Sequence, residues 1–264
     1  MKTCLCFNLD KNMKVPAAVM TQSLADNYSG SEILDVVYVV PENEIEEIAD
    51  TLSKVESPKF NLIYRPTVKH DDIDLSAIEH PHWTTNITFD RLFLGSTLFD
   101  YEKVIYFDCD MLAVKDIQPI LDFKLIGKFA ATPDISHSII DRDDPHVVEF
   151  NNGFFIADLR WWRDSGVEVE FKNHLKNIEM NIFKEQLVFN LYTKDVYQPT
   201  PQTFNFLVFK RDQNYNHPNW DASEIKEHYK RAIIIHFAGR DKPWNYKDDK
   251  SKIGRQWREL ASRF

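Results

Sequence analysis

Short apolar segments, rich in β-branched and aromatic residues, alternate with helical segments along the first part of this chain. The predicted strands are Thr3–Phe7, Asp35–Val40, Phe60–Tyr64 and Val104–Phe107. The predicted helices are Pro16–Tyr28, Glu42–Val55 and Ile87–Phe99. This β-α-β-α-β order predicts an α/β fold in which a parallel sheet is covered by helices on both faces. Ligands of such sheets bind at the carboxyl ends of the strands.

The second half of the chain has a less regular pattern. Phe150–Leu159 (FNNGFFIADL) is predicted to be a strand that opens with a polar kink, and Arg231–Phe237 (RAIIIHF) a buried strand that ends near a histidine. Lys184–Tyr192 is predicted to be a helix, and Ile253–Phe264 a short amphipathic helix. No repeat, linker or shift in composition divides the 264 residues, so we expect a single domain.

Two carboxylates follow the apolar strand in the segment VIYFDCDMLAV. Asp108 and Asp110 are two residues apart, and in an extended chain they point to the same side. Like charges held this close are costly unless a cation joins them. A pair of this kind is common in turns, but at the end of a buried strand it indicates a divalent-cation site.

A third ligand is available at His236, which ends another apolar strand that a parallel sheet would bring to the same edge. Two oxygens and one imidazole suit Mn²⁺ better than Mg²⁺, which stays open as an alternative. A satisfied structural histidine is the competing interpretation. The segment that begins at His236, HFAGRDKPW, also contains Gly239 and Lys242. Glycine permits close approach of the backbone to a ligand, and lysine offers a point charge to a phosphate. A metal ligand and a phosphate-binding lysine within seven residues are what a diphosphate leaving group would require.

Several function classes are disfavoured by the sequence. The net charge of -9 argues against a nucleic-acid surface. The chain has no GxGxxG after its first strand and no GxxxxGK[ST], so dinucleotide oxidoreductases and P-loop NTPases are disfavoured. The three cysteines (Cys4, Cys6 and Cys109) have no zinc-site spacing, and we expect buried free thiols and a cytoplasmic location. The start of the chain has no signal-peptide pattern, and no stretch of 18 apolar residues predicts a membrane span.

Five segments, in this order, resemble the retaining glycosyltransferases of family 8, which include glycogenin and bacterial lipopolysaccharide galactosyl- and glucosyltransferases. They are FNLDKNMKVPAAVMTQSL near the start, TFDRLFLG at 88–95, VIYFDCDMLAV, FNNGFFIADLRWW at 150–162, and HFAGRDKPW. The resemblance covers nearly the whole chain. It implies a GT-A fold, with a Rossmann-like, mainly parallel sheet flanked by helices, a UDP-sugar donor, and Mn²⁺ held by Asp108, Asp110 and His236. The resemblance also places Cys109, between the two aspartates, among the residues that bind the UDP-sugar donor.

Three residues at the end of the first strand match the family's uridine pocket. They are Asn8, Asp10 and Asn12. The resemblance implies that Asp10 accepts the uracil N–H, and the competing interpretation is that Asp10 caps a turn.

The residues that match the family's diphosphate and sugar contacts come from distant segments. Arg91 matches an arginine that faces the donor's phosphate and sugar, although an ion pair with Asp90 or Asp100 is an alternative. Gly239 and Lys242 match diphosphate contacts. Asn151 and Asn152 fall where the family has Asn followed by a small residue, so the second asparagine implies a narrower or differently hydrogen-bonded sugar pocket.

The predicted helix KEQLVFN matches the family's catalytic helix. Gln186 is expected to face the anomeric carbon and stabilise positive charge with its carbonyl. Glu185 stands where the family more often has Asp, which leaves the donor sugar open. Asp134 is aligned as a further sugar-site acid.

The resemblance implies a GT-A domain over residues 1–250, and the spacing of the apolar residues predicts a C-terminal amphipathic helix over 251–264. This helix either packs on the domain, the preferred interpretation, or touches an anionic membrane as a peripheral contact. The acceptor is left open as a glycan, a lipid-linked molecule or a protein. The transferred sugar is expected to be glucose, galactose or N-acetylhexosamine. A catalytically silent nucleotide-sugar binding protein and a metal-dependent nucleotidyltransferase are the alternative functions.

Overall fold

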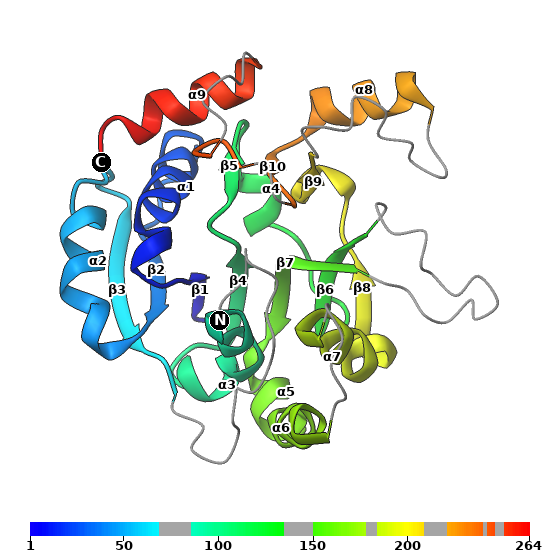
Figure 1. Cartoon of the computed structure of the whole chain (residues 1–264). Helices are drawn as coiled ribbons and strands as arrows, with labels where there is room; N and C mark the ends of the chain where they lie inside the picture. The colour runs from blue at the N-terminus through cyan, green and yellow to red at the C-terminus, as the bar shows by residue number, and fades with distance from the viewer. Residues whose placement is uncertain (69–85, 135–149, 178–183, 209–220, 240–241, 246–250) are drawn as a thin grey trace.

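The computed structural model describes residues 1–68, 86–134, 150–177, 184–208, 221–239, 242–245 and 251–264. Within these residues a seven-stranded sheet has the order β3-β2-β1-β4-β7-β6-β8 (Figure 1). Its strands are β1 (Thr3–Asn8), β2 (Leu34–Val40), β3 (Phe60–Pro66), β4 (Lys103–Phe107), β6 (Phe129–Pro133), β7 (Phe150–Asp158) and β8 (Tyr197–Pro199). All pairs are parallel except those of β7, which runs antiparallel to both β4 and β6. The mainly parallel sheet predicted from the sequence is confirmed.

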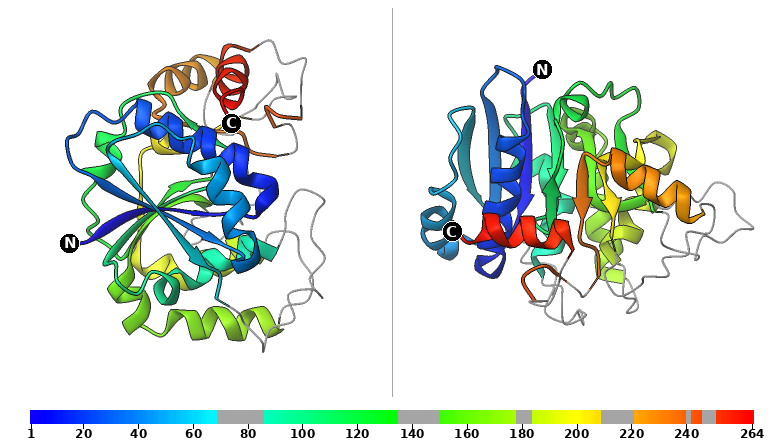
Figure 2. Two further views of the ribbon diagram at one scale, coloured as in Figure 1. Left: turned by 90° about the vertical axis from the view of Figure 1, so that its left-hand side faces the viewer. Right: turned by 90° about the horizontal axis from the view of Figure 1, so that it is seen from above.

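Helices cover both faces of this sheet, as two further views show (Figure 2). They are α1 (Lys14–Asp26), α2 (Ile45–Leu52), α3 (Leu94–Thr97), α4 (Gln118–Leu121), α5 (Leu159–Asp164), α6 (Val167–Asn177), α7 (Lys184–Thr193), α8 (Ala222–Arg231) and α9 (Lys252–Ala261). The core on one face includes side chains of α1 and α2, and the core on the other includes side chains of α3, α5, α6 and α7. The strands are therefore apolar on both sides, which explains their continuous hydrophobic runs.

A second, smaller sheet lies beside the first and carries His236. It contains β5 (Met111–Ala113), β10 (Ile234–His236) and β9 (Phe206–Leu207). β10 runs antiparallel to β5, with His236 opposite Met111. His236 does lie near the aspartates, as expected, but the expectation that parallel strand pairing brings it there is wrong. The histidine arrives by antiparallel pairing with the strand that follows Asp110.

Three predicted elements differ clearly from those observed. The helix predicted over Glu42–Val55 is a 3₁₀ helix, Glu42–Glu44, followed by α2. The segment predicted as one helix over Ile87–Phe99 is a 3₁₀ helix, Asn86–Phe93, followed by the short α3. Phe89 and Leu92, three residues apart, are both buried, and three-residue spacing is the repeat of a 3₁₀ helix. The strand predicted over Arg231–Phe237 is shorter, because α8 extends to Arg231 from a capping box formed by Asp221 and Glu224.

The C-terminal helix α9 packs against α1 (Figure 1). Its apolar side chains Trp257 and Leu260 are buried, and the Trp257 ring lies 5.2 Å from that of Trp244. The Lys54 ammonium donates to the carbonyl of Phe264 at 3.3 Å, which ties the end of the chain to the region after α2. The apolar side of α9 is thus part of a core. None of the described helices has both the length and the apolar character needed to cross a bilayer.

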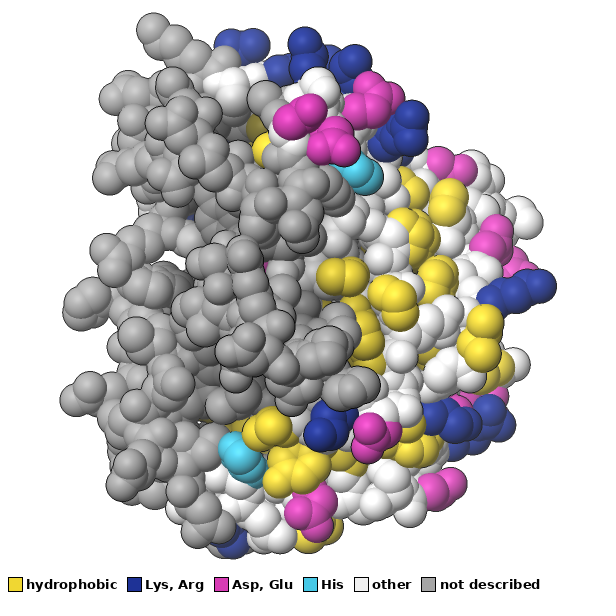
Figure 3. All heavy atoms as spheres, turned by 90° about the vertical axis from the view of Figure 1, so that its right-hand side faces the viewer, with side chains coloured by type: hydrophobic (Ala, Val, Ile, Leu, Met, Phe, Trp, Pro, Cys, Tyr) yellow, Lys and Arg dark blue, Asp and Glu magenta, His cyan; other side chains and the backbone are white. Residues whose placement is uncertain are grey.

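The face of the molecule that carries β8 and α7 exposes hydrophobic side chains. Figure 3 shows them across the middle of the part of this face that is not grey, with charged side chains at the top, at the bottom and along the right-hand edge. Large exposed hydrophobic residues of the described chain include Ile126, Val169, Leu191 and Tyr229. They lie outside the three buried clusters that form the core.

Candidate active site

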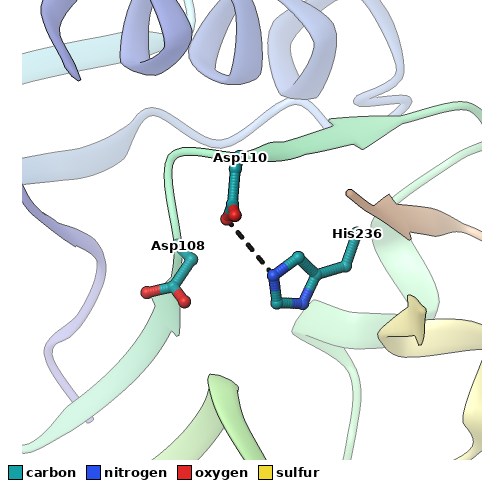
Figure 4. Close-up of side chains that lie close together, drawn as sticks. All are labelled: Asp108, Asp110 and His236. Carbon is teal, nitrogen blue, oxygen red and sulfur yellow. Dashed lines mark ion pairs between the residues drawn. The ribbon is translucent and has the colours of Figure 1, made fainter. Parts of the chain in front are cut away.

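Asp108 and Asp110 flank a turn between two strands of different sheets. Asp108 follows β4 of the large sheet, and Asp110 precedes β5 of the small one. The chain turns at Cys109–Asp110, so the extended run that we expected across the pair is not present. Both carboxylates nevertheless point toward one space (Figure 4). With His236 they offer one ligand atom each, and these three atoms lie within 4.8 Å of one another.

His236 approaches Asp110 through the pairing of β10 with β5. Its Nε2 lies 3.2 Å from Asp110 Oδ1, as the dashed line in Figure 4 marks. The next residue, Phe237, donates its backbone N–H to the Asp110 carbonyl at 2.9 Å. An unprotonated ring nitrogen and a carboxylate oxygen this close repel each other unless a cation or a proton lies between them. This arrangement fits two ligands of one cation, and without the cation a proton on Nε2 would donate to Asp110.

The carboxylate of Asp108 is held through one oxygen by two side chains. Arg91 and the Tyr106 hydroxyl both contact Oδ1, each at 3.0 Å. Arg91 also donates to the Asn152 carbonyl at 3.1 Å, and its guanidinium lies 5.0 Å from the centre of the Tyr106 ring. The Arg91 side chain is 6% exposed and the Asp108 side chain 22%, so the ion pair is buried on the arginine side and half-buried on the aspartate side. Because Oδ1 is taken up, Oδ2 is the oxygen that faces the space between Asp108 and His236.

Among the described residues the ion pair of Arg91 is with Asp108, and not with Asp90 or Asp100 as the alternative held. Asp100 instead binds Lys2 and Arg65. The two aspartates named in that alternative are close to Arg91 in the sequence, whereas Asp108 comes near Arg91 only when the end of β4 packs against the 3₁₀ helix.

Gly153 leaves room for this cluster. A Cβ atom at Gly153 would lie 2.6 Å from His236 Cε1, 2.8 Å from Asp108 Oδ2 and 2.9 Å from Asn151 Oδ1. The Gly153 carbonyl also accepts the Asp108 backbone N–H at 2.7 Å. Strand β7 therefore approaches the cluster so closely that only glycine fits. The two carboxylates, the imidazole and this opening fit a divalent cation.

Lys242 completes the charge balance of the cluster. Its ammonium contacts Asp110 Oδ2 and donates to the Phe237 carbonyl at 2.7 Å. Burial works to raise the pKa of Asp110, but the Lys242 ammonium and His236 beside it hold this pKa well below its ordinary value. Asp110 is therefore ionised at neutral pH. The sequence predicted that Lys242 lies near a phosphate, and here its ammonium lies on a carboxylate of the candidate metal site.

Two asparagines near the cluster carry buried amide atoms without a hydrogen-bond partner among the described residues. Both amide atoms of Asn8 are in this state, and so is Nδ2 of Asn152. The two residues are 7% and 5% exposed. Buried amide groups are nearly always hydrogen-bonded in native proteins. Unmet donors and acceptors here are a feature expected of a pocket that binds a polar ligand.

Other residues of the implied nucleotide pocket lie around the end of β1. Asp10 Oδ1 accepts the Asn12 backbone N–H at 2.9 Å, so Asp10 does cap a turn, as the competing interpretation holds. Asn12 is exposed. The Cys109 thiol is buried in the core and donates to the Asn8 carbonyl at 3.7 Å. Burial, followed by Asp108 and Asp110, raises the pKa of this thiol, so Cys109 is an unreactive packing residue.

Asn205 was not predicted from the sequence, yet it contacts the cluster. It is fully buried, its Oδ1 lies 2.9 Å from His236 Nδ1, and its Nδ2 donates to Asn151 Oδ1 at 3.0 Å. The one sequence signal was a polar residue between aromatic residues in TFNFLVF. Asn151 thus reaches the cluster through Asn205.

The remaining predicted residues lie on separate elements. Gly239 has a φ of 78°, a left-handed conformation that favours glycine. Gln186 lies on α7 and is half-buried, and its backbone carbonyl accepts from the Asn190 side chain at 2.8 Å, separately from its side-chain amide. Glu185 lies on the same helix, but its side chain is outside the described residues. Asp134 is buried at the end of β6.

Comparison with known proteins identifies related chains. Residues 4–248 match the family described as "Glycosyl transferase family 8". Glycosyltransferase 8 domain-containing protein 2 of Bos taurus is 24% identical over 268 residues, which is 87% of this chain and 75% of that protein. Lipopolysaccharide 1,2-glucosyltransferase of Escherichia coli (strain K12) is 26% identical over 178 residues, 62% of this chain and half of that protein.

Solved structures share the fold. The galactosyltransferase LgtC, in complex with donor and acceptor sugar analogues, superimposes with a TM-score of 0.69 at 20% identity, covering 98% of this chain and 95% of that one. The apo structure of the bifunctional glycosyltransferase WbbM gives a TM-score of 0.75 at 18% identity, and 99% of this chain covers 50% of it. These likenesses confirm the expected single-domain GT-A fold.

Proposed function

This chain belongs to glycosyltransferase family 8, and we propose that it is a Mn²⁺-dependent, retaining hexosyltransferase with a UDP-sugar donor. The acceptor class remains that of the sequence analysis: a glycan, a lipid-linked molecule or a protein. The observation that carries the proposal is the convergence of Asp108, Asp110 and His236, with ligand atoms within 4.8 Å of one another. They meet beyond the carboxyl end of β4, where α/β sheets bind their ligands.

The choice of Mn²⁺ rests on the ligand set. Two carboxylates and one imidazole suit a borderline ion, whereas Mg²⁺ favours oxygen ligands and is the second candidate. When bound, the cation acts as a Lewis acid that stabilises negative charge on a departing diphosphate. Gly153 supports this assignment, because a Cβ atom there would collide with both His236 and Asp108.

The nucleotide part of the donor is assigned to the end of β1. Asn8 has a buried amide with both atoms unpaired within the described residues, and a base or ribose would supply partners. Asp10 retains one carboxylate oxygen beyond the one used in the turn cap, and this oxygen is the proposed acceptor for the uracil N–H. Asn12 belongs to the same turn and is the third proposed contact.

Positive charge for the diphosphate comes from two buried or half-buried side chains. Arg91 is fixed in place by Asp108 and by the Asn152 carbonyl. Lys242 contacts the other carboxylate of the pair, that of Asp110. Fixed positive groups of this kind favour charge that develops on a leaving group. Gly239, in its left-handed conformation, would let the backbone approach a phosphate closely.

The sugar is assigned to residues of α7 and of the start of β7, which contact each other through the Phe150 N–H and Asn190. Loss of UDP leaves positive charge on the anomeric carbon, the same oxocarbenium character found in glycoside hydrolysis. The Gln186 carbonyl is the proposed stabilising group, with Glu185 and Asp134 toward the sugar hydroxyls. Asn151 and Asn152 line the opposite side. The acceptor hydroxyl would enter on the face that UDP leaves and pass its proton to the departing phosphate oxygen, which retains configuration.

Location and partners complete the proposal. The three cysteines are free and buried, which is typical of a reducing compartment, so we place the protein in the cytoplasm. Membrane contact through 250–264 would be peripheral and would involve the polar rim of α9, because its apolar side packs on the domain.

The experiment measures UDP release from a panel of UDP-sugars, each with Mn²⁺, with Mg²⁺ and with EDTA. Metal-dependent release from one sugar supports the proposal and identifies the donor. UDP binding without turnover, tested again with candidate acceptors, would favour a catalytically silent nucleotide-sugar binding protein. Absence of UDP binding, or turnover unaffected by EDTA, contradicts the proposal. Release of pyrophosphate from a nucleoside triphosphate and a sugar phosphate would instead identify a nucleotidyltransferase.

A further inference from the structure

Asn205 occupies a fully buried position between the two sheets. It follows the 3₁₀ helix Gln202–Phe204 and directly precedes β9 of the small sheet. Its side chain bridges His236, on β10, and Asn151, on β7 of the large sheet, at 2.9 and 3.0 Å. Both ends of its amide are therefore engaged. A side chain in this position can control how the small sheet presents the imidazole to Asp110, and to Asp108 at the end of β4 in the large sheet.

The direction of these hydrogen bonds is set by a backbone donor. The Gly153 N–H donates to Asn151 Oδ1 at 3.0 Å, and a backbone N–H cannot act as an acceptor. Asn151 Oδ1 therefore points toward Asn205, and only the NH₂ end of Asn205 can donate to it. This leaves the Asn205 oxygen facing His236 Nδ1. An amide oxygen can only accept, so Nδ1 must carry the proton.

With the proton on Nδ1, the lone pair of His236 lies on Nε2. That atom faces Asp110 Oδ1 at 3.2 Å and is the nitrogen of the candidate ligand set. The opposite tautomer would set a lone pair against the Asn205 oxygen, which is unfavourable, and would place an N–H on Nε2, the atom that faces Asp110 and the candidate cation site. Metal-bound histidines in proteins generally donate their second N–H to such a partner, which fixes tautomer and ring orientation.

We propose that Asn205 is a positioning residue that holds His236 in the Nδ1–H tautomer, so that Nε2 is the metal-ligating atom. The proposal rests on the metal site of the proposed function. It adds that the Gly153–Asn151–Asn205–His236 chain couples the backbone of β7 to the imidazole. The hydrogen bond to Asn205 thus orients the imidazole so that Nε2, and not Nδ1, faces the candidate cation site.

The main test replaces Asn205 with leucine, which is similar in size and cannot accept a hydrogen bond. His236 is observed by ¹⁵N NMR in the metal-free protein, with its resonances assigned from the spectrum of His236→Gln. Mn²⁺ affinity is measured from the free-ion EPR signal, with and without UDP. We expect Asn205→Leu to lose the Nδ1–H signature and to bind Mn²⁺ roughly 10- to 100-fold more weakly, with turnover recovering at high Mn²⁺.

Two further variants separate positioning from packing. Asn205→Asp keeps an acceptor for Nδ1–H and is expected to retain the tautomer and most of the Mn²⁺ affinity. Asn190→Leu removes a comparably buried amide, one that bonds the Phe150 N–H at 3.2 Å, and is expected to leave Mn²⁺ affinity unchanged. If Asn205→Leu does not fold, Asn205→Ala is measured in the same way.

An unchanged tautomer and unchanged Mn²⁺ affinity in Asn205→Leu would overturn the proposal, as would equal losses in Asn190→Leu. Failure of the metal site itself gives a different result. The wild-type protein would then bind no Mn²⁺, whereas the tautomer measurement would still show whether Asn205 fixes the imidazole.

Discussion

The Lys242 ammonium binds the carboxylate of Asp110, one of the three groups that converge on the candidate metal site. It donates at the same time to the Phe237 carbonyl at 2.7 Å, so it is held from two sides. A cation bound to Asp110 would meet this positive charge at close range. Lysine and metal therefore compete for one carboxylate, and a diphosphate would relieve the competition by giving the lysine a new partner.

Replacing Lys242 with methionine separates these effects. We expect Mn²⁺ to bind Lys242→Met on the order of tenfold more tightly in the absence of nucleotide, because the competing ammonium is gone. UDP should bind more weakly once Mn²⁺ is present, because one phosphate contact is lost. Calorimetric titration measures both. Lys226→Met, at an exposed position on α8, is the control and should change neither. Weaker Mn²⁺ binding to Lys242→Met without nucleotide would disprove the competition.

Removing one metal carboxylate tests the site directly. Asp110→Asn keeps the size of the side chain but lowers its charge, and turnover should fall by roughly 10²–10³-fold if charge stabilisation dominates. The measurement is Mn²⁺-dependent UDP release from the preferred donor. Asp195→Asn, an exposed carboxylate after α7, serves as the matched control. Near-normal turnover of Asp110→Asn would exclude the metal assignment.

Gly153→Ala probes the space between the ligands. The added methyl would lie 2.6 Å from His236 Cε1 and 2.8 Å from Asp108 Oδ2, so one of these side chains must move. We expect a folded protein whose Mn²⁺ affinity falls by about tenfold or more, as for loss of an orienting contact. Circular dichroism checks the fold, and metal-free UDP binding checks that the nucleotide pocket is intact. Full Mn²⁺ affinity would show that β7 does not limit the site.

Asp90 makes stability depend on pH. Burial raises the pKa of this carboxyl to about 7, against a smaller opposing effect of Arg91. Between its ordinary pKa, 3.8, and about 7, the folded protein keeps a proton that the unfolded chain has released. The contribution of Asp90 to stability therefore falls as pH rises through this window.

Asp90→Asn should remove that dependence. Relative to wild type, we expect the free energy of unfolding of the variant to increase between about pH 4 and about pH 7, by up to about 4 kcal/mol, and then to level off. Urea denaturation across this range measures the difference, in which other titrating groups cancel. A constant difference would mean that Asp90 titrates at its ordinary pKa.

The packing of α9 gives a prediction about the end of the chain. Trp257 is 2% exposed and contacts Trp244, so Trp257→Ala should lower the free energy of unfolding by about 3 kcal/mol. Urea denaturation measures this, with the exposed Glu259→Ala as control. If α9 were instead a membrane-binding helix, Trp257→Ala would leave stability unchanged and weaken pelleting with anionic vesicles.

Much of the fold follows from local sequence patterns. Apolar runs located β1 to β4 and β7, and proline, glycine and helical spacing located α1, α2, α7 and α9. The aspartates, the histidine and Lys242 stood out because charged or ligating groups next to buried strands need a reason. These features are local, since hydrophobic periodicity and the cost of burying charge act over a few residues. The sequence therefore determined which elements form and which residues carry the chemistry.

The tertiary structure decided how those residues meet. The antiparallel insertion of β7, the pairing of β10 with β5, and the partner of Arg91 depend on strand register between segments far apart in the chain. The roles of Asn205 and Gly153 at the candidate site depend on their neighbours in space, which are His236 for both and also Asp108 for Gly153. Local periodicity sets which face a side chain occupies, but it contains no information on which distant strand will pack there. That choice is made by the packing of the whole core, and it alone gives Asn205 the imidazole of His236 as its partner.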